Sequence, residues 1–223
     1  MPGGQIQSTA SLVGGGFFVV VVAMSDVLLQ ANQLGGAHFA PISFALYPGE
    51  ILMVQGESGA GKSQLLRALA DLDAHSGTIV LRDVEQQQMP ASRWRRQVMY
   101  LPAESAWWDD YVDAHFAHRP PDAWFSALRL SSNLFTAPVS RLSSGERQRL
   151  AVLRSLVLAP DVLLLDEPTA NLDNTTAQAT AALLAEQIRA QGQAAVWVTH
   201  DPAEAERLGD RQLFMHSASS PQV

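Results

Sequence analysis

Hydrophobic residues along the chain form two kinds of pattern, short unbroken apolar runs and longer segments with helical spacing. The runs predict strands at residues 27–31, 42–46, 51–55, 78–81, 98–101, 162–165, 194–198 and 211–216. Helical spacing predicts helices at residues 62–72, 90–97, 145–158, 174–190 and 202–208. A Tyr-Pro-Gly-Glu turn is predicted at residues 47–50. Because strands alternate with helices, we expect an α/β fold whose mostly parallel sheet is flanked by helices on both faces.

Residues 102–141 interrupt this alternation. They contain four prolines and three of the five tryptophans, which predicts a loop-rich inserted subdomain and not a second folding unit. The segment is unusually aromatic, with Trp107, Trp108, Tyr111, Phe116, Trp124 and Phe125. Such residues either anchor an interface or fill a small core, and the sequence leaves both alternatives open.

Two groups of charged residues lie in or beside this segment. The acidic group comprises Asp109, Asp110 and Asp113, with His115 and His118 nearby, and the basic group comprises Arg93, Arg95 and Arg96. The acidic group matches no known ligand spacing of a metal site, so we interpret it as a solvated acidic loop. The basic group is interpreted as the solvated face of the short helix at residues 90–97.

An apolar run near the start of the chain, residues 12–24, reads LVGGGFFVVVVAM. It is shorter than the roughly 20 residues of a membrane-spanning helix, and no basic residue precedes it as in a secretory signal. We expect residues 1–23 to be an extension outside the fold, with Met24 as an alternative start. A weak membrane-surface anchor is the competing interpretation.

Composition narrows the possible functions. A length of 223 residues suffices to bury a full core, and the lack of Cys excludes disulfide scaffolds, thiol nucleophiles and thiolate metal sites. The net charge of −7 argues against a nucleic-acid-binding protein, so we expect no nucleic-acid partner. Among the 15 basic residues Lys62 is the only lysine.

That lysine lies in a glycine-rich motif that follows one predicted strand and precedes a predicted helix. The motif G-x-x-x-x-G-K-[ST] is matched by Gly56, Glu57, Ser58, Gly59, Ala60, Gly61, Lys62 and Ser63. Its backbone N–H groups would surround phosphate oxygens, Lys62 would reach the β- and γ-phosphates, and the Ser63 hydroxyl would bind Mg²⁺. The alternative, a glycine-rich turn with a surface lysine, would not explain why the motif lies between a strand and a helix. We call residues 56–63 the phosphate loop.

A second motif ends the apolar strand at residues 162–165 with Asp166 and Glu167. Ligands of open α/β folds bind at the carboxyl ends of the strands. Asp166 is therefore a candidate Mg²⁺ ligand, and Glu167 is a candidate base that polarises an attacking water.

The third motif, residues 142–149, is a polar helix start with the sequence LSSGERQR. Its N–H groups could face an anion, or it could be an ordinary helix cap with Ser143 or Ser144 as the capping residue. Physical reasoning alone leaves these two interpretations open.

Taken in order, 56-GESGAGKS-63, 142-LSSGERQR-149, 162-VLLLDEPTANLD-173 and 197-WVTHD-201 resemble the motifs of an ATP-binding cassette (ABC) ATPase, the nucleotide-binding subunit of an ABC transporter. The resemblance covers residues 27–216. It implies a P-loop NTPase core with a small antiparallel β region at the N-terminal side and a short helical subdomain at about residues 103–150. The whole would be one ABC ATPase domain over residues 24–223.

The resemblance also implies roles for individual residues. ATP would be bound by the phosphate loop and Gln64, with Asp166 linked to Mg²⁺, Glu167 as the catalytic base and His200 on the γ-phosphate. Asp173 would lie in the loop that communicates across a dimer. The signature motif, Leu142, Ser143, Ser144, Gly145 and Glu146, would cap the nucleotide of the opposite subunit of a head-to-tail homodimer.

Several positions depart from the family pattern. Gln64 stands where Thr is usual, Ser144 where Gly is usual, and Glu146 replaces a Gln. The glutamine expected after Tyr100-Leu101-Pro102 is missing, because Ala103 follows and then Glu104, a candidate substitute oxygen donor. The aromatic residue that stacks on adenine is also missing, since Leu34 stands there with Phe39 nearby, which predicts a looser grip on the purine.

The resemblance implies an ATPase that powers transport together with separate transmembrane permease subunits, which would hold it at the cytoplasmic face of the cell membrane. One alternative is a soluble ABC ATPase without a membrane partner. Another is a nucleotide-sensing module with weak turnover, suggested by Ser144 and the missing glutamine.

Overall fold

The computed structural model describes residues 27–216, and the extension predicted at residues 1–23 lies outside the described residues. Its centre is a five-stranded sheet in the order β6-β7-β8-β3-β9, in which every neighbouring pair is parallel. The strands are β3 (Ile51–Gly56), β6 (Val98–Leu101), β7 (Val162–Asp166), β8 (Ala194–Val198) and β9 (Arg211–Met215). The predicted parallel sheet is confirmed.

Successive side chains of each central strand point to opposite faces of this sheet, so each strand contributes to two hydrophobic cores, one on either face. In β3, Leu52 and Val54 belong to one core, whereas Ile51 and Met53 belong to the other. The strands β7 and β8 divide in the same way. Because both faces are covered, these strands are continuous apolar runs and not half-polar ones, which is why their positions were readable from the sequence.

A second, antiparallel sheet lies beside the first and has the order β2-β1-β4-β5. Its strands are β1 (Leu29–Gly36), β2 (Phe39–Leu46), β4 (Ser76–Leu81) and β5 (Val84–Glu85). This confirms the small antiparallel region. The limits predicted for the first strand, residues 27–31, were wrong, because β1 runs to Gly36. Its later residues Asn32 and Gln33 bond to neighbouring strands, but their polar side chains did not mark them as part of a strand.

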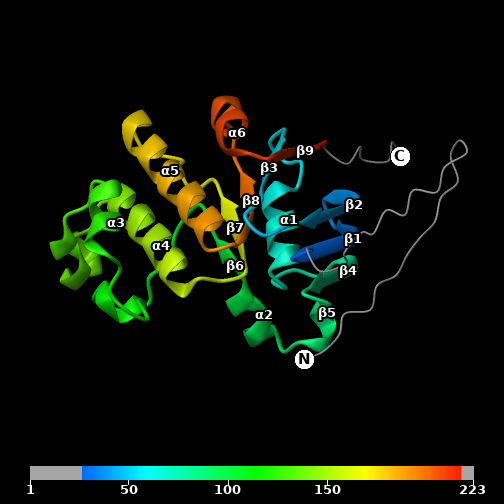
Figure 1. Cartoon of the computed structure of the whole chain (residues 1–223), viewed down its shortest axis with the longest axis horizontal. Coiled ribbons are helices and arrows are strands. Elements are labelled where there is room, and N and C mark those ends of the chain that lie inside the picture. Colours follow the sequence, from blue (N-terminus) through cyan, green and yellow to red (C-terminus); the bar gives the residue numbers. More distant parts are fainter. Residues whose placement is uncertain (1–26, 217–223) are drawn as a thin grey trace, which may run out of the picture.

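The helices form layers on either side of the parallel sheet (Figure 1). Helix α1 (Lys62–Leu69) packs between the two sheets, and α4 (Ser144–Leu158), α5 (Asn174–Ala190) and α6 (Pro202–Leu208) cover the opposite face. Helix α1 ends three residues before the predicted residue 72, because Asp71 adopts a left-handed φ of 57°. The limits predicted for α5, β8 and α6 are confirmed.

The short helix α2 (Ala91–Gln97) is tied to the end of α1. Trp94 is fully buried and its indole nitrogen donates a hydrogen bond to the Leu69 carbonyl oxygen at 2.8 Å. The solvated basic face predicted here is confirmed, because Arg93, Arg95 and Arg96 are all exposed. Arg95 also donates to the Asp71 carbonyl oxygen at 2.6 Å.

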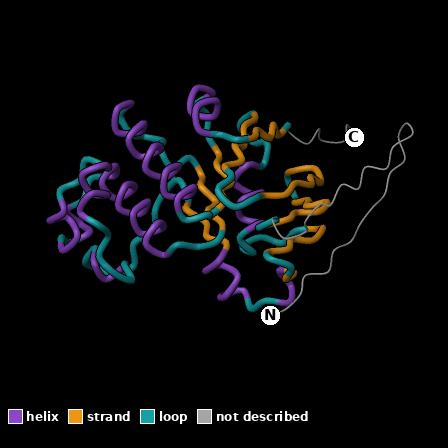
Figure 2. Tube along the Cα trace, viewed as in Figure 1, coloured by secondary structure: helices purple, strands orange, loops and turns teal. Residues whose placement is uncertain are grey.

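Short helical turns gather at the far end of the molecule from the antiparallel sheet (Figure 2). They are the 3-10 turns η2 (Asp113–His115), η3 (Ser132–Thr136) and η4 (Val139–Arg141) and the helix α3 (Asp122–Ala127); a further turn, η1 (Gln86–Gln88), follows β5. None of these pieces was predicted, because elements of three to six residues are too short to show periodicity.

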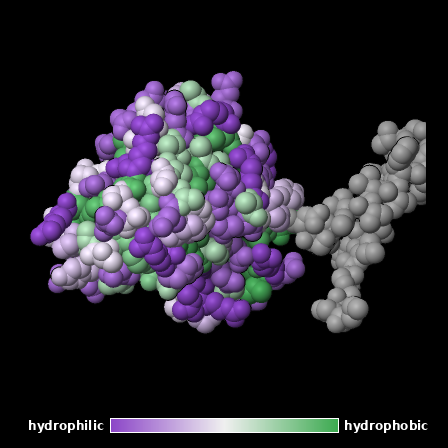
Figure 3. Space-filling view, turned by 60° about the vertical axis from the view of Figure 1, so that its left-hand side comes forward, coloured by the Kyte–Doolittle hydropathy of each residue, from purple (hydrophilic) through white to green (hydrophobic). Residues whose placement is uncertain are grey.

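The aromatic residues of this region divide into buried and exposed ones. Phe125 is 1% exposed and lies edge-on to Phe135, so it fills a core. Trp108 and Tyr111 are 70% and 53% exposed, so they remain available to a partner. On the face shown in Figure 3, hydrophobic residues lie in small patches among hydrophilic ones.

His115 organises the loop that carries these exposed rings. Its Nε2 accepts hydrogen bonds from the backbone N–H groups of Trp108 (2.9 Å) and Asp109 (3.0 Å), and its Nδ1 lies 2.9 Å from the Tyr111 carbonyl oxygen. The ring therefore carries its proton on Nδ1. His115 is 6% exposed, so the interpretation of this group as a solvated loop was wrong for the histidine.

Candidate functional site

The phosphate loop joins β3 to α1 and folds around its own lysine. The Lys62 Nζ donates to the carbonyl oxygens of Gly56 (2.8 Å) and Glu57 (2.9 Å), and the residue is 7% exposed. Gly61 has a φ of 85°, and a Cβ there would lie 2.9 Å from the His38 carbonyl oxygen, so only glycine fits. The loop thus holds one ammonium group at the start of a helix, where an anion is favoured.

A cavity of about 350 Å³ opens beside this loop. It is lined by His38, Ser58, Gly59, Gly61, Lys62, Ser63, Gln64, Glu167 and His200. The structure therefore brings together the phosphate-loop residues and the two residues that were assigned to catalysis from distant motifs.

Glu167 and His200 meet because their strands are neighbours. Strand β7 pairs with β8 in the register Asp166 to Val198, which brings the residues after both strand ends side by side. The His200 Nε2 lies 2.9 Å from the Glu167 Oε1. About half of the His200 side chain is exposed, so both polar groups face the open side of the cavity.

Asp166 lies deeper, at 5% exposure, with both carboxylate oxygens engaged. The Ser63 hydroxyl donates to Oδ1 at 3.2 Å, and the Tyr100 hydroxyl donates to Oδ2 at 2.8 Å. Burial first, and then this hydrogen bond to Asp166, raise the pKa of Tyr100, so the phenol stays protonated and acts as a donor. Sequence reasoning missed Tyr100, because nothing local shows which strand lies beside β7.

For residues 142–149 the sequence left open an anion-facing helix start or an ordinary helix cap, and the structure shows the cap. Ser143 is the helix cap: its Oγ accepts from the Glu146 backbone N–H at 3.2 Å, and the Glu146 carboxylate accepts from the Ser143 N–H at 2.9 Å and hydroxyl at 2.8 Å. These bonds, the one from the backbone N–H first, lower the pKa of Glu146. The spacing Ser-x-x-Glu was a signal for this reciprocal cap.

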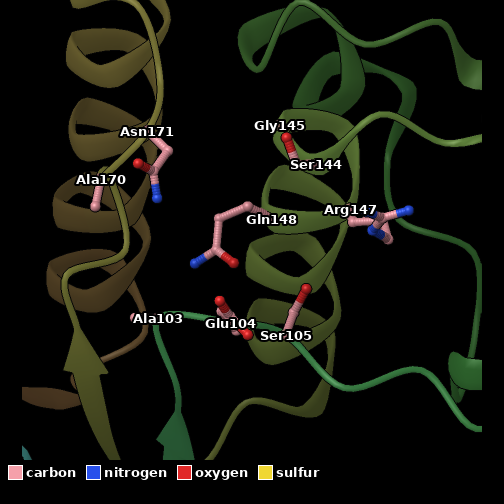
Figure 4. Close-up of a pocket in the computed structure, with 9 residues that line it drawn as sticks. All are labelled: Ala103, Glu104, Ser105, Ser144, Gly145, Arg147, Gln148, Ala170 and Asn171. Carbon is pink, nitrogen blue, oxygen red and sulfur yellow. The ribbon is translucent and has the colours of Figure 1, made fainter.

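The signature residues Ser144 and Gly145 line a different cavity of about 360 Å³, shown in Figure 4. Glu104 and Ser105 approach it from the loop after β6, Gln148 from α4, and Asn171 from the loop before α5. Glu104 thus shares this cavity with the start of α4, and it is not among the residues that line the cavity beside the phosphate loop.

Two further predicted positions have local roles in the structure. Asp173 caps α5, since its Oδ1 accepts from the Thr176 N–H at 3.0 Å, and the hydrogen bonds to Thr176 lower the pKa of Asp173. Leu34 and Phe39 are buried in the core, at 0% and 4% exposure, whereas His38 between them in sequence lines the cavity beside the phosphate loop. Sequence reasoning missed His38, and the turn between β1 and β2 was the available signal.

Comparison with known proteins decides the family. A family model described as ABC transporter matches residues 39–170, more than half of the chain. The chain belongs to the ABC transporter family. It is accordingly an ATP-binding ATPase of that family.

Individual members of the ABC family resemble it over most of its length. The lipoprotein-releasing system ATP-binding protein LolD of Idiomarina loihiensis is 34% identical over 213 residues, which cover 83% of this chain and 93% of LolD. The aliphatic sulfonates import ATP-binding protein SsuB 2 of Paracoccus denitrificans is 39% identical over 189 residues, 78% of this chain and 69% of SsuB 2. A dimeric ATP-binding cassette solved in a post-hydrolysis state with ADP and Pi has the same fold, with a TM-score of 0.72 at 20% identity over 85% of this chain and 96% of that one.

Proposed function

We propose that this ABC ATPase powers a transporter through ATP-driven, head-to-tail dimerisation of two copies. The observation that carries the proposal is the division of the site. Lys62, Glu167 and His200 share one cavity, whereas Ser144 and Gly145 line another. A nucleotide bound at the phosphate loop of one copy is therefore free to receive the signature residues of a second copy.

In this proposal ATP places its phosphates against the phosphate loop. The Lys62 ammonium leaves the carbonyl oxygens of Gly56 and Glu57 and contacts the β- and γ-phosphates. Gln64, which lines the same cavity from the first turn of α1, contacts the phosphates as well. The His38 ring lines the cavity and offers a planar face to the purine in place of the missing aromatic residue.

The residues around Asp166 fit a magnesium ion. Ser63 and Asp166 present a hydroxyl and a carboxylate within hydrogen-bond distance of each other, and oxygen ligands of this kind are those that Mg²⁺ prefers. When bound, Mg²⁺ neutralises negative charge on the phosphate oxygens. Glu104 is a candidate additional oxygen donor in this proposal, although it lines the cavity beside Ser144 and Gly145 and not the one beside the phosphate loop.

Hydrolysis then rests on Glu167 and His200. The Glu167 carboxylate accepts the proton of the attacking water, and the His200 ring, held 2.9 Å from the Glu167 Oε1, contacts the γ-phosphate. The signature residues of the second copy complete the site in this proposal, because the first turn of a helix favours an anion. The loop that ends at Asp173 lies at the same dimer face, and the dimeric post-hydrolysis cassette with this fold supports the arrangement.

We further propose that a permease subunit docks on the exposed rings of Trp108 and Tyr111. Arg154 packs beneath Trp108 with its guanidinium carbon 4.9 Å from the ring centroid. His115 accepts a hydrogen bond from the backbone N–H of Trp108 in the same loop. The patch is thus exposed but rigidly supported, as is typical of interface anchors. The transport systems named for LolD and SsuB 2 support a membrane partner and a position at the cytoplasmic face of the membrane.

Glu167→Gln tests the ATPase proposal. The variant should keep ATP affinity, lose hydrolysis by about 10²–10⁴-fold and accumulate as an ATP-bound dimer in light scattering. Glu186→Gln, an exposed glutamate on α5, is the matched control and should behave as wild type. Unchanged turnover in Glu167→Gln would remove it as the base.

Trp108→Ala tests the docking patch. Wild-type protein purified from native membranes should bring a polytopic membrane protein with it, and the variant should lose that partner while keeping its basal ATPase activity. Phe214→Ala, with a side chain that is 59% exposed on β9, is the control. Recovery of wild type without any membrane protein would favour the soluble ABC ATPase.

A nucleotide-sensing module with weak turnover is the second candidate. It is favoured by one observation, that the glutamine-loop position is Ala103 and the neighbouring Glu104 lines the signature cavity. Steady-state turnover of wild type that stays at the level of Glu167→Gln would support it.

A further inference from the structure

The carboxylate of Asp166 is held from both sides by hydroxyl groups. Ser63 in α1 donates to Oδ1 at 3.2 Å, and Tyr100 in β6 donates to Oδ2 at 2.8 Å. The Ser63 hydroxyl belongs to the phosphate loop and serves the ion itself in the proposed function. The Tyr100 hydroxyl has no such role, so its purpose has to be found in the contact with Asp166.

The sheet places Tyr100 for this contact. Strand β6 pairs in parallel with β7, and Tyr100 stands opposite Leu164, two residues before Asp166. The ring is half buried and packs against the core between the two sheets, which limits its rotation. The hydroxyl at its tip is therefore delivered to the end of β7 by a side chain whose position is set by the core.

A fixed donor on Oδ2 decides how the carboxylate is turned. The terminal torsion of an aspartate is broad and nearly two-fold, so an unsupported carboxylate samples many orientations. With Oδ2 bound to Tyr100, the other oxygen is directed at Ser63. Outer partners of this kind commonly determine how well a metal ligand binds.

We infer that Tyr100 is a positioning residue that orients the Asp166 carboxylate toward the divalent cation. The inference rests on the proposed assignment of Asp166 to Mg²⁺. Strand β6 would then contribute to the metal site through its third residue, Tyr100. This residue lies before the glutamine-loop position, which is Ala103 in this chain.

Tyr100→Phe tests the inference, because it removes the hydroxyl and keeps the ring in the core. The measurement is the affinity of Mn²⁺ for the full-length protein bound to the β,γ-imido analogue of ATP, followed by electron paramagnetic resonance. We expect the Mn²⁺ dissociation constant to rise about tenfold. Affinity for the same nucleotide in EDTA should stay as in wild type, and the unfolding temperature should fall by only a few degrees, because the buried Asp166 carboxylate loses one donor. Tyr47→Phe, at an exposed tyrosine in the turn before β3, is the matched control.

Two outcomes would overturn the inference in distinguishable ways. If Tyr100→Phe binds Mn²⁺ within twofold of wild type while Asp166→Asn loses it, Asp166 holds the cation and Tyr100 does not orient it. If Asp166→Asn also keeps wild-type affinity, the cation is held elsewhere and the proposed magnesium site fails together with the role of Tyr100.

Discussion

The reciprocal cap at the start of α4 is where a small change should have the most interpretable effect. Ser143 and Glu146 exchange three hydrogen bonds at 2.8–3.2 Å. Ser143→Ala removes the hydroxyl, so the Glu146 N–H loses its acceptor and the carboxylate keeps only the Ser143 N–H. Glu146→Gln keeps a side chain of the same size and removes the negative charge from the helix start.

The magnitudes follow from the geometry. Replacing a serine cap by alanine destabilises a protein by about 1 kcal/mol, and we expect about 1.2 kcal/mol because one of the two bonds lost is charge-assisted. Removing the Glu146 charge at a partly exposed helix start should cost about 0.8 kcal/mol after allowance for screening. Since the two residues share their bonds, the double variant should lose about 1.5 kcal/mol, which leaves a coupling energy of about 0.5 kcal/mol. For a chain of this size each kcal/mol lowers the unfolding temperature by about 2–4 °C.

The pH dependence has a definite sign. The pKa of Glu146 is lowered by folding, so its stabilisation is present above the ordinary glutamate pKa, near 4.5, and is lost as the pH falls through the lower folded value. The stability difference between wild type and Glu146→Gln should therefore shrink when the pH is lowered from 7 to below 4.

Urea unfolding followed by circular dichroism measures these differences. Ser92→Ala, at an exposed serine in α2, is the control and should unfold as wild type. A Ser143→Ala protein within 0.3 kcal/mol of wild type, or a Glu146→Gln difference that does not shrink as the pH is lowered, would refute the role of the cap.

Three further predictions concern other parts of the molecule. Amine-directed reagents should modify only Lys62 and the N-terminal amine, and ATP should protect Lys62; peptide mass spectrometry that finds no protection would contradict the phosphate-loop assignment. His115→Ala should destabilise the protein by about 2 kcal/mol, because two backbone N–H groups lose their acceptor, and an unchanged urea midpoint would exclude this. Arg154→Ala removes a guanidinium packed on Trp107 and Trp108 and should cost about 1–2 kcal/mol, whereas the exposed Arg207→Ala should cost nothing measurable; equal midpoints for the two variants would refute the stacking contribution.

Much of the architecture can be predicted from local patterns of apolar and polar residues in the sequence. The limits of α5, β8 and α6 follow from the sequence, because each is a segment whose periodicity or apolar run reports burial on known faces. The phosphate loop is equally local, since its glycines, lysine and serine act as one contiguous unit. The motif order was sufficient to expect Glu167 and His200 in one site, and the structure places them 2.9 Å apart.

Other features depend on which elements become neighbours. Tyr100 reaches Asp166 across 66 residues only because β6 lies beside β7, and strand order leaves no trace in either strand's own pattern. His115 looked like part of an acidic loop, yet folding turned its ring inward to bind the backbone beside Trp108. The sequence by itself determined the elements and the phosphate chemistry, since these depend on residues adjacent along the chain. Only the tertiary structure decided the partners of Tyr100 and His115, because those contacts exist only after distant segments have packed together.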